Sequence, residues 1–369
     1  MTPQVRAELL RQIWWAAVDA VRGDSAVARA LNDHPIPRPD LILAVGKAAV
    51  AMARPAQSRF GAPTLAVTKH GHSEPNLPFE VLEAAHPVPD TTSLAAGARL
   101  LKAVATLRPG THLLLLVSGG ASALAEVLRP GTTLADLAAL NRNLLASGQD
   151  IATMNATRTG LSLIKGGGLL ARFRGSQVTV LAISDTRGDR IETIGSGIGL
   201  CPLRPGLVCE TTIVASNTVA RAAAEAKAQA LGLTVLRNDE SLYDDVATAA
   251  DLMGRNLPAS PGLAIFGGEP TVVLPPNPGH GGRNQALALH LARVIRGQGD
   301  LSVLVAGTDG SDGPTAAAGG LVDGATWDLR AAAYLTTADS GTFLASRDAL
   351  FTSGPTGTNV MDLALVLRG

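Results

Sequence analysis

The sequence has few cysteines and no long apolar run, and each shortage excludes a class of protein. Its two cysteines, Cys201 and Cys209, belong to no CxxC pair and have no neighbouring histidine, which disfavours a zinc site and favours ordinary reduced thiols. No apolar run approaches the ~20 residues that a membrane helix requires. Residues 1–23 also lack the continuous apolar centre of a signal peptide. A cytoplasmic protein without a membrane partner is therefore predicted.

The sequence has no excess of charge of either sign. Its 31 Lys and Arg residues balance 31 Asp and Glu residues, so the formal net charge is zero. A neutral chain has no bulk electrostatic attraction to nucleic acid, which is therefore not predicted as a partner. The hydrophobic fraction of 46% and the length of 369 residues predict a folded protein with two domains.

Short apolar runs alternate with alanine-rich stretches through most of the sequence. The runs at 41–45, 64–68, 112–118 and 178–184 are apolar almost throughout, as strands buried on both faces of a parallel sheet are. Several end in glycine or polar residues and precede a helical pattern, which predicts an α/β fold with its sites at the carboxyl ends of the strands. A second strand–helix series follows the proline-containing segment 200–210. We therefore place the domains at 1–210 and 211–369.

The standard motifs of nucleotide-binding and hydrolytic sites are missing. Gly46-Lys47 lacks the first glycine and the following hydroxyl residue of a P-loop, and no G-x-G-x-x-G joins a strand to a helix. No G-x-S-x-G is present, so a hydrolase lacks its usual signature. Lys47 nevertheless follows an apolar strand directly, where its ammonium group can face a phosphate or a carboxylate. An ordinary surface lysine is the alternative.

Two glycine-rich segments are candidate anion sites. Ser118–Ser122 (SGGAS) follows the most apolar strand, and its glycines and the next helix N-terminus can approach a phosphate. A tight turn without a ligand is the alternative. Met154–Gly168, interpreted as a helix, places Asn155, Arg158, Ser162 and Lys165 within ~80° of one another, ending at three glycines. A solvated polar face explains this stripe equally well.

Polar loops after later strands add carboxylates and a guanidinium group. Two acidic pairs, Asp185 with Asp189 and Asp309 with Asp312, lie in glycine-containing loops, where carboxylates can hold magnesium or orient a hydroxyl group. Turn formation is the alternative for both pairs. The loop Gly279–Gln285 contains Arg283, which can bind a carboxylate or phosphate in a bidentate manner.

Ten motifs, taken in order, carry a resemblance to a known family. The first half has AVGKAA (44–49), TKHGH (68–72), AAHPVPD (84–90), SGGASAL (118–124) and MNATRTGLSLIKGG (154–167). The second half has GGEPTVVL (267–274), GHGGRNQALAL (279–289), AGTDGSDGPTAAAGGLVDG (306–324), DSGTF (339–343) and GPTGTNVMDL (354–363). Together they resemble the glycerate 2-kinases, which have a C-terminal MOFRL domain and include relatives labelled hydroxypyruvate reductase.

The resemblance implies a Rossmann-like α/β N-terminal domain with a parallel sheet, a smaller α/β C-terminal domain, and an active site in the cleft between them. ATP would donate its γ-phosphoryl group to the 2-hydroxyl of D-glycerate, with Mg²⁺ bridging the phosphates. Such a transfer depends on positioning and on neutralised charge. The oligomeric state, including a homodimer, is left open.

The family's expected catalytic cations fall on Lys47 and Arg283, and Asp189 joins them as a catalytic carboxylate. The nucleotide is assigned to Ser118, Gly119, Gly120, Ser122, Lys165, Gly166, Gly167, Asp185, Ser196 and Gly197. The substrate is assigned to Lys47, Arg158, Arg283, Asn284, Thr356 and Asn359, and the metal to Asp309 and Asp312. Asp185, Asp189, Asp309 and Asp312 are not ranked among themselves as magnesium ligands or general base.

The chain departs from the family pattern at two places. Ala121 replaces the third glycine of SGGGSAL, and its Cβ either crowds a phosphate or is accommodated at negative φ. The run SDTRGDR has Arg190 where the family has a second aspartate, and Ile198-Gly199 replaces Pro-Thr. Such changes can alter magnesium binding or substrate choice. A kinase for another hydroxy or sugar acid, a hydroxypyruvate-type oxidoreductase and a non-catalytic binding protein are the alternatives.

Overall fold

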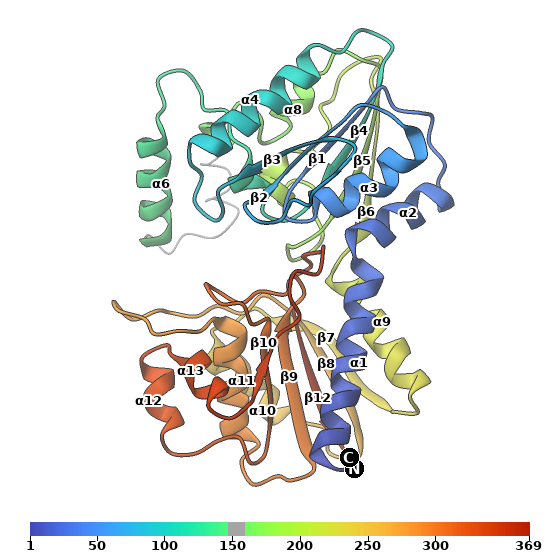
Figure 1. Cartoon of the computed structure of the whole chain (residues 1–369). Coiled ribbons are helices and arrows are strands. Elements are labelled where there is room, and N and C mark those ends of the chain that lie inside the picture. The colour runs from blue at the N-terminus through green and yellow to red at the C-terminus, as the bar shows by residue number, and fades with distance from the viewer. Residues whose placement is uncertain (147–158) are drawn as a thin grey trace. The chain divides into compact units, whose positions relative to one another are not determined.

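The computed structural model describes residues 1–146 and 159–369, and the chain divides into two compact units. The parallel-sheet unit contains Arg22–Ser216 and Gly357–Asn359. The mixed-sheet unit contains Met1–Val21, Asn217–Thr356 and Val360–Gly369. Each unit has one sheet with helices packed against it (Figure 1).

The parallel-sheet unit has six parallel strands in the order β3-β2-β1-β4-β5-β6. The strands are β1 (Leu41–Val45), β2 (Thr64–Lys69), β3 (Glu80–Ala84), β4 (His112–Val117), β5 (Gln177–Ile183) and β6 (Val208–Ala215). The helices are α2 (Gly23–Asp33), α3 (Ala49–Phe60), α4 (Thr91–Ala105), α5 (Ala121–Leu124), α6 (Leu134–Ala146) and α8 (Gly168–Ala171), with the 3-10 helix η1 (Ile194–Gly197). The predicted parallel sheet is confirmed.

The apolar runs of this sheet are continuous because both of its faces are covered. Leu43 and Val45 of β1 pack in one cluster with Leu100 of α4. Successive side chains alternate between faces, so Ile42 and Ala44 point to the opposite face, where α3 packs on β1 and β2. Every residue of β4 is buried as a result.

The mixed-sheet unit has six strands in the order β11-β10-β9-β12-β8-β7, of which only the β7–β8 pair is parallel. The strands are β7 (Val235–Leu242), β8 (Gly262–Gly268), β9 (Leu301–Gly307), β10 (Gly319–Asp323), β11 (Leu350–Phe351) and β12 (Asp362–Arg368). The helices are α1 (Pro3–Val21), α9 (Asn217–Ala230), α10 (Val246–Arg255), α11 (Arg283–Val294), α12 (Ala331–Thr336) and α13 (Ser340–Ala345).

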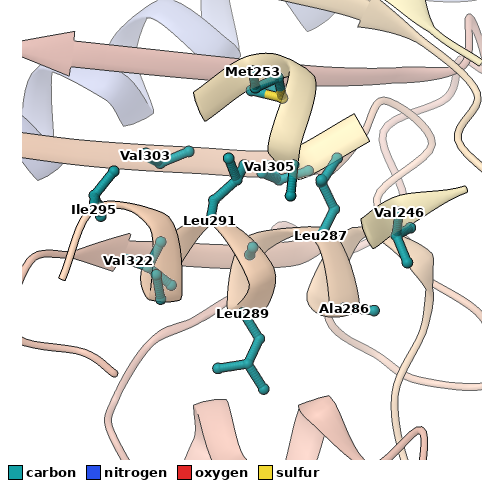
Figure 2. Close-up of a cluster of buried hydrophobic side chains, with 14 of the residues drawn as sticks. Val246, Met253, Ala286, Leu287, Leu289, Leu291, Ile295, Val303, Val305 and Val322 are labelled. Carbon is teal, nitrogen blue, oxygen red and sulfur yellow. The ribbon is translucent and has the colours of Figure 1, made fainter. Parts of the chain in front are cut away.

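Helix α11 supplies the centre of the mixed-sheet core. Its Leu287 and Leu291 lie with Val303 and Val305 of β9 and Val322 of β10 in one buried cluster (Figure 2). The other face of the sheet is covered by α1, which contacts β9 and β12, and by α9, which contacts β8. Cover on both faces again explains why every residue of β8 and β9 is buried.

The limits of the two units differ in two ways from the predicted single boundary near residue 210. Helix α1 belongs to the mixed-sheet unit, where Leu10, Ile13 and Trp14 are fully buried. Gly357–Asn359, close to the C-terminus, belong to the parallel-sheet unit. Both differences depend on contacts between segments that are distant in sequence. Within the described residues, no helix has the length and apolar content needed to span a membrane.

Two local predictions were wrong. Cys201 and Cys209 form a disulfide, with Cα atoms 6.1 Å apart, instead of remaining reduced; the turn at Gly206 lets the chain return from η1 to the edge strand β6. The predicted helix over 154–168 does not continue through its described part. Residues 161–167 form a bridge and turns there, and Gly166 and Gly167 have positive φ.

Candidate functional site

Two turns meet at the carboxyl edge of the parallel sheet. The strand order reverses direction between β1 and β4, and ligands of open α/β sheets bind outside the carboxyl ends of the strands at such a point. There the Ser118 N–H donates to the Val45 carbonyl at 3.0 Å, and the Lys47 N–H donates to the Gly119 carbonyl at 2.8 Å. The buried Ser118 hydroxyl accepts from the Ala48 N–H at 3.0 Å. These bonds fix Lys47 against the 118–120 turn.

Glycines 119 and 120 allow other side chains to approach this turn. An added Cβ at Gly120, where φ is +83°, would lie 3.1 Å from Lys47 Cγ and 3.2 Å from His86 Nε2. An added Cβ at Gly119 would collide with the side chains of Asp185 and Asn359. Asn359 Nδ2 donates to Asp185 Oδ2 at 3.3 Å. Residues from the ends of β1, β3, β4 and β5 are thereby brought together.

Two further predicted segments lie against each other in this unit. The N–H groups of Gly166 and Gly167 donate to the carbonyls of Ser196 and Gly197 at 2.9 and 2.8 Å. The Ser196 hydroxyl is 2.8 Å from the Ser122 hydroxyl. The KGG turn, the η1 turn and the SGGAS turn therefore form one continuous hydrogen-bonded group.

Lys165 is buried and paired with a residue that was not predicted. Its Nζ donates to Glu126 Oε2 at 2.6 Å, and the two side chains are 3% and 1% exposed. The Ser162 hydroxyl donates to Glu126 Oε1 at 2.6 Å. The lysine charge is thus balanced by Glu126 inside the unit. A single acid within the apolar run ASALAEVL was the available signal for this partner.

A cavity of about 210 Å³ opens beside these turns. Its lining residues are His86, Pro87, Pro89, Gly120, Ser122, Ala123, Leu137 and Lys165. His86 was not among the predicted site residues, although its motif AAHPVPD belonged to the family resemblance. Ala121 does not face this cavity: it is the first residue of α5, is fully buried, and its methyl packs toward Gly195. The missing third glycine is therefore accommodated in the core.

The mixed-sheet unit holds a second polar cluster around Arg283, the first residue of α11. Arg283 Nε donates to Asp362 Oδ2 at 2.7 Å, and its Nη1 donates to Glu269 Oε1 at 2.8 Å. Asn284 Nδ2 donates to Asp362 Oδ1 at 2.9 Å. Burial alone would lower the pKa of Arg283, but the carboxylates of Asp362 and Glu269 outweigh it and raise the pKa. Neither acid was predicted as a site residue.

Asp312 caps the helix that presents Arg283. Its two oxygens accept from the N–H groups of Asn284 and Gln285 at 3.0 and 2.8 Å, the first turn of α11. Burial raises the pKa of Asp312 to about 6; the Asp362 charge adds to the rise, and the two backbone bonds oppose it. Because both of its oxygens accept hydrogen bonds from the first turn of α11, Asp312 is poorly suited to bind magnesium.

The remaining predicted residues are placed as follows. Asp309, after β9, accepts from the N–H and hydroxyl of Ser311 at 2.9 and 3.0 Å, and is only partly buried. The buried Thr356 hydroxyl donates to the Thr308 carbonyl at 2.6 Å. Asp189 lies in the loop after β5 with φ +53°. Arg158 lies outside the described residues. Within residues 1–146 and 159–369, no three His, Cys, Asp or Glu side chains gather in a metal-binding arrangement.

The strand order β3-β2-β1-β4-β5-β6, with glycine-rich turns at its switch point, defines a Rossmann-like α/β protein. Residues 9–230 match the family described as "Domain of unknown function (DUF4147)", and residues 262–362 match the MOFRL family. These two matches, together with a relative named D-glycerate 2-kinase that covers 99% of the chain, show that the chain belongs to the glycerate 2-kinase family.

Relatives and solved structures agree with this membership. D-glycerate 2-kinase of Thermotoga maritima is 34% identical, with 99% of each chain covered. A relative from Agrobacterium vitis with the provisional name hydroxypyruvate reductase is also 34% identical, covering 89% of this chain and 99% of its own. The crystal structure of glycerate kinase from Thermotoga maritima superposes with a TM-score of 0.87 at 33% identity, covering 99% of this chain and 100% of that one.

Proposed function

We propose that the protein is an ATP-dependent kinase that transfers the γ-phosphoryl group to the 2-hydroxyl of D-glycerate. The observation that carries this proposal is the meeting of Lys47 with the 118–122 turn at the switch point of the parallel sheet. Relatives along the whole chain are named glycerate kinases, which supports the same reaction class.

The residues of the parallel-sheet unit suit the phosphate side of this reaction. Lys47 supplies a positive charge for the transferring phosphoryl group, and phosphoryl transfer depends chiefly on such positioning and charge neutralisation. The hydrogen-bonded turns around Gly119, Gly166 and Ser196 let a backbone approach phosphate oxygens closely. Asp185 lies beside the same turn, and we assign it to nucleotide binding.

The Arg283 cluster suits binding of the substrate carboxylate or the phosphoryl group. Its guanidinium group is held in a fixed orientation by Asp362 and stays one-third exposed, so it can still meet an anion. For Mg²⁺, Asp309 has the carboxylate chemistry that this ion prefers, and the ion would neutralise phosphate charge when bound. The homodimer remains a prediction. The cytoplasmic location also remains a prediction, and the Cys201–Cys209 disulfide removes the reduced cysteines as an argument for it.

The proposal is tested by assaying phosphoryl transfer from Mg²⁺-ATP to a panel of small hydroxy acids. We expect D-glycerate to be phosphorylated at the 2-position, with Lys47→Ala and Arg283→Ala each losing at least about 100-fold in kcat/KM. Lys69→Ala, at the end of β2, and Arg293→Ala, in the last turn of α11, are the matched controls.

The outcomes separate the alternatives. If another acid is preferred, the protein is still a kinase, and the SDTRGDR loop becomes the candidate determinant of substrate choice. Absence of transfer to every acid, with no binding of ATP, contradicts the proposal. The hydroxypyruvate reductase name of some relatives makes NADH the second ligand to test; binding of NADH without ATP would favour an oxidoreductase.

A further inference from the structure

His86 reaches the candidate site from a strand that contributes no other site residue. It follows β3, so it lies at the same carboxyl edge of the sheet as Lys47. Its Cδ2 and Nε2 atoms each lie 3.2 Å from the point where a Cβ at Gly120 would stand, and Lys47 Cγ lies 3.1 Å from that point. The edge of the imidazole ring and the lysine stem therefore both lie close to Gly120.

The cavity beside His86 has room for a small acid. Its volume of about 210 Å³ is below the roughly 300–1,000 Å³ of pockets for larger organic ligands. Pro87, Pro89, Ala123 and Leu137 form its apolar wall. The Ser122 hydroxyl also lines the cavity, and it can donate to or accept from a substrate hydroxyl.

Two charged groups near the cavity, Lys165 and Asp90, are engaged by other residues. Lys165 in the wall is balanced by Glu126 at 2.6 Å. Lys47 stands beside the ring across Gly120, and Asp90, four residues further along the same loop, is engaged in capping α4 through Thr92 and Ser93. An imidazole is the side chain whose ordinary pKa lies nearest neutrality, which suits a general base.

We propose that His86 is the general base that accepts the proton of the attacking hydroxyl of a small 2-hydroxy acid bound in this cavity. This assignment rests on the proposed kinase function. As the hydroxyl oxygen forms its bond to the γ-phosphorus, the O–H proton passes to an imidazole nitrogen of His86. The bond between the γ-phosphorus and the β,γ-bridging oxygen breaks, and its electron pair leaves with ADP. The proton then passes from the imidazolium to solvent.

The test compares pH profiles of kcat/KM for the hydroxy acid at saturating Mg²⁺-ATP. The wild-type profile is expected to fall on the acid side, because a protonated imidazole cannot accept the hydroxyl proton. His86→Gln is expected to lose about 100-fold or more in kcat, to keep KM within about threefold, and to lose the acid limb. His70→Gln, an exposed histidine of the preceding loop, is the matched control and should match the wild type.

Each remaining outcome overturns a defined claim. An active wild-type enzyme whose His86→Gln variant keeps its kcat and its acid limb overturns the assignment of His86 alone. If His86→Gln does not fold, as judged by circular dichroism, a wild-type profile without an acid limb overturns it in the same way. A wild-type protein without kinase activity on any acid overturns the proposed function, and the role of His86 with it.

Discussion

Arg283 is bound by two carboxylates that differ in burial. The side chain of Asp362 is 2% exposed and that of Glu269 is 47% exposed. An ion pair at the surface contributes little because water screens it, whereas a buried partner fixes orientation. Asp362 therefore determines where the guanidinium group points.

We expect Asp362→Asn to lower kcat/KM about 10–100-fold, because Arg283 loses its oriented partner. Glu269→Gln is the matched control and should stay within about threefold of the wild type. Steady-state kinetics of both variants at one pH provide the comparison. Equal losses in the two variants would contradict the orienting role of Asp362.

A second prediction at the residue scale concerns the buried pair of Lys165 and Glu126. Removing one partner of a buried pair leaves an uncompensated charge, which costs about 3–5 kcal/mol. We expect Glu126→Gln to lower the free energy of unfolding by that amount, and the double variant with Lys165→Met to regain most of it. Denaturant unfolding measures both, and a stable single variant would show that the pair is not formed.

Asp312 gives the stability a specific pH dependence. Its pKa of about 6 in the folded protein lies above the ordinary 3.8, so the folded state holds more protons between these values. The free energy of unfolding therefore falls as the pH rises from about 4 to 6, by roughly 2–3 kcal/mol from this group. Unfolding curves of the wild type and Asp312→Asn from pH 4 to 7.5 test this, because the variant lacks the slope. Parallel profiles would exclude the raised pKa.

At the scale of elements, the turn between β4 and α5 is more constrained than its sequence suggests. The helix α5 has only four residues, and it ends because Ala125 adopts an extended conformation. The Glu126 N–H then donates to the Ser93 carbonyl at 3.0 Å. Backbone packing, not a long helix, therefore positions the SGGAS turn.

Gly120→Ala tests this packing. The alanine needs a left-handed conformation, which costs about 1–2 kcal/mol, and its Cβ also presses on Lys47 and His86. Gly71→Ala has a similar φ of +76° and open space around it, so it carries the backbone cost alone. We expect the loss of stability in Gly120→Ala to be at least as large as in Gly71→Ala, and a loss of kcat/KM of at least about tenfold only in Gly120→Ala. Equal activities would show that the turn tolerates a side chain.

At the scale of the whole molecule, each unit has its own hydrophobic core. Leu291 lies in the core of the mixed-sheet unit, and Leu115 lies in that of the parallel-sheet unit. Large-to-small changes at such buried positions cost about 2–5 kcal/mol.

We expect Leu291→Ala to speed amide hydrogen exchange in β9 and β12 while leaving β4 protected, and Leu115→Ala to do the reverse. The reason is that local stability follows the contacts of each cooperative unit. Exchange measured by mass spectrometry on the two variants makes the comparison. Faster exchange in both sheets of either variant would show that the two cores unfold together.

The sequence by itself determined the α/β class, the four central parallel strands, the family and the positions of Lys47, Arg283 and the glycine-rich turns. Apolar periodicity and glycine spacing are local properties, so they can be recognised in a chain without coordinates. Tertiary structure alone decided that α1 joins the mixed-sheet unit and that Cys201 pairs with Cys209. It also decided that Glu126 neutralises Lys165, that Asp362 holds Arg283, and that His86 lies at Gly120. The disulfide depends on the turn at Gly206, and the others depend on burial or on contacts between segments distant in sequence, which local periodicity does not encode.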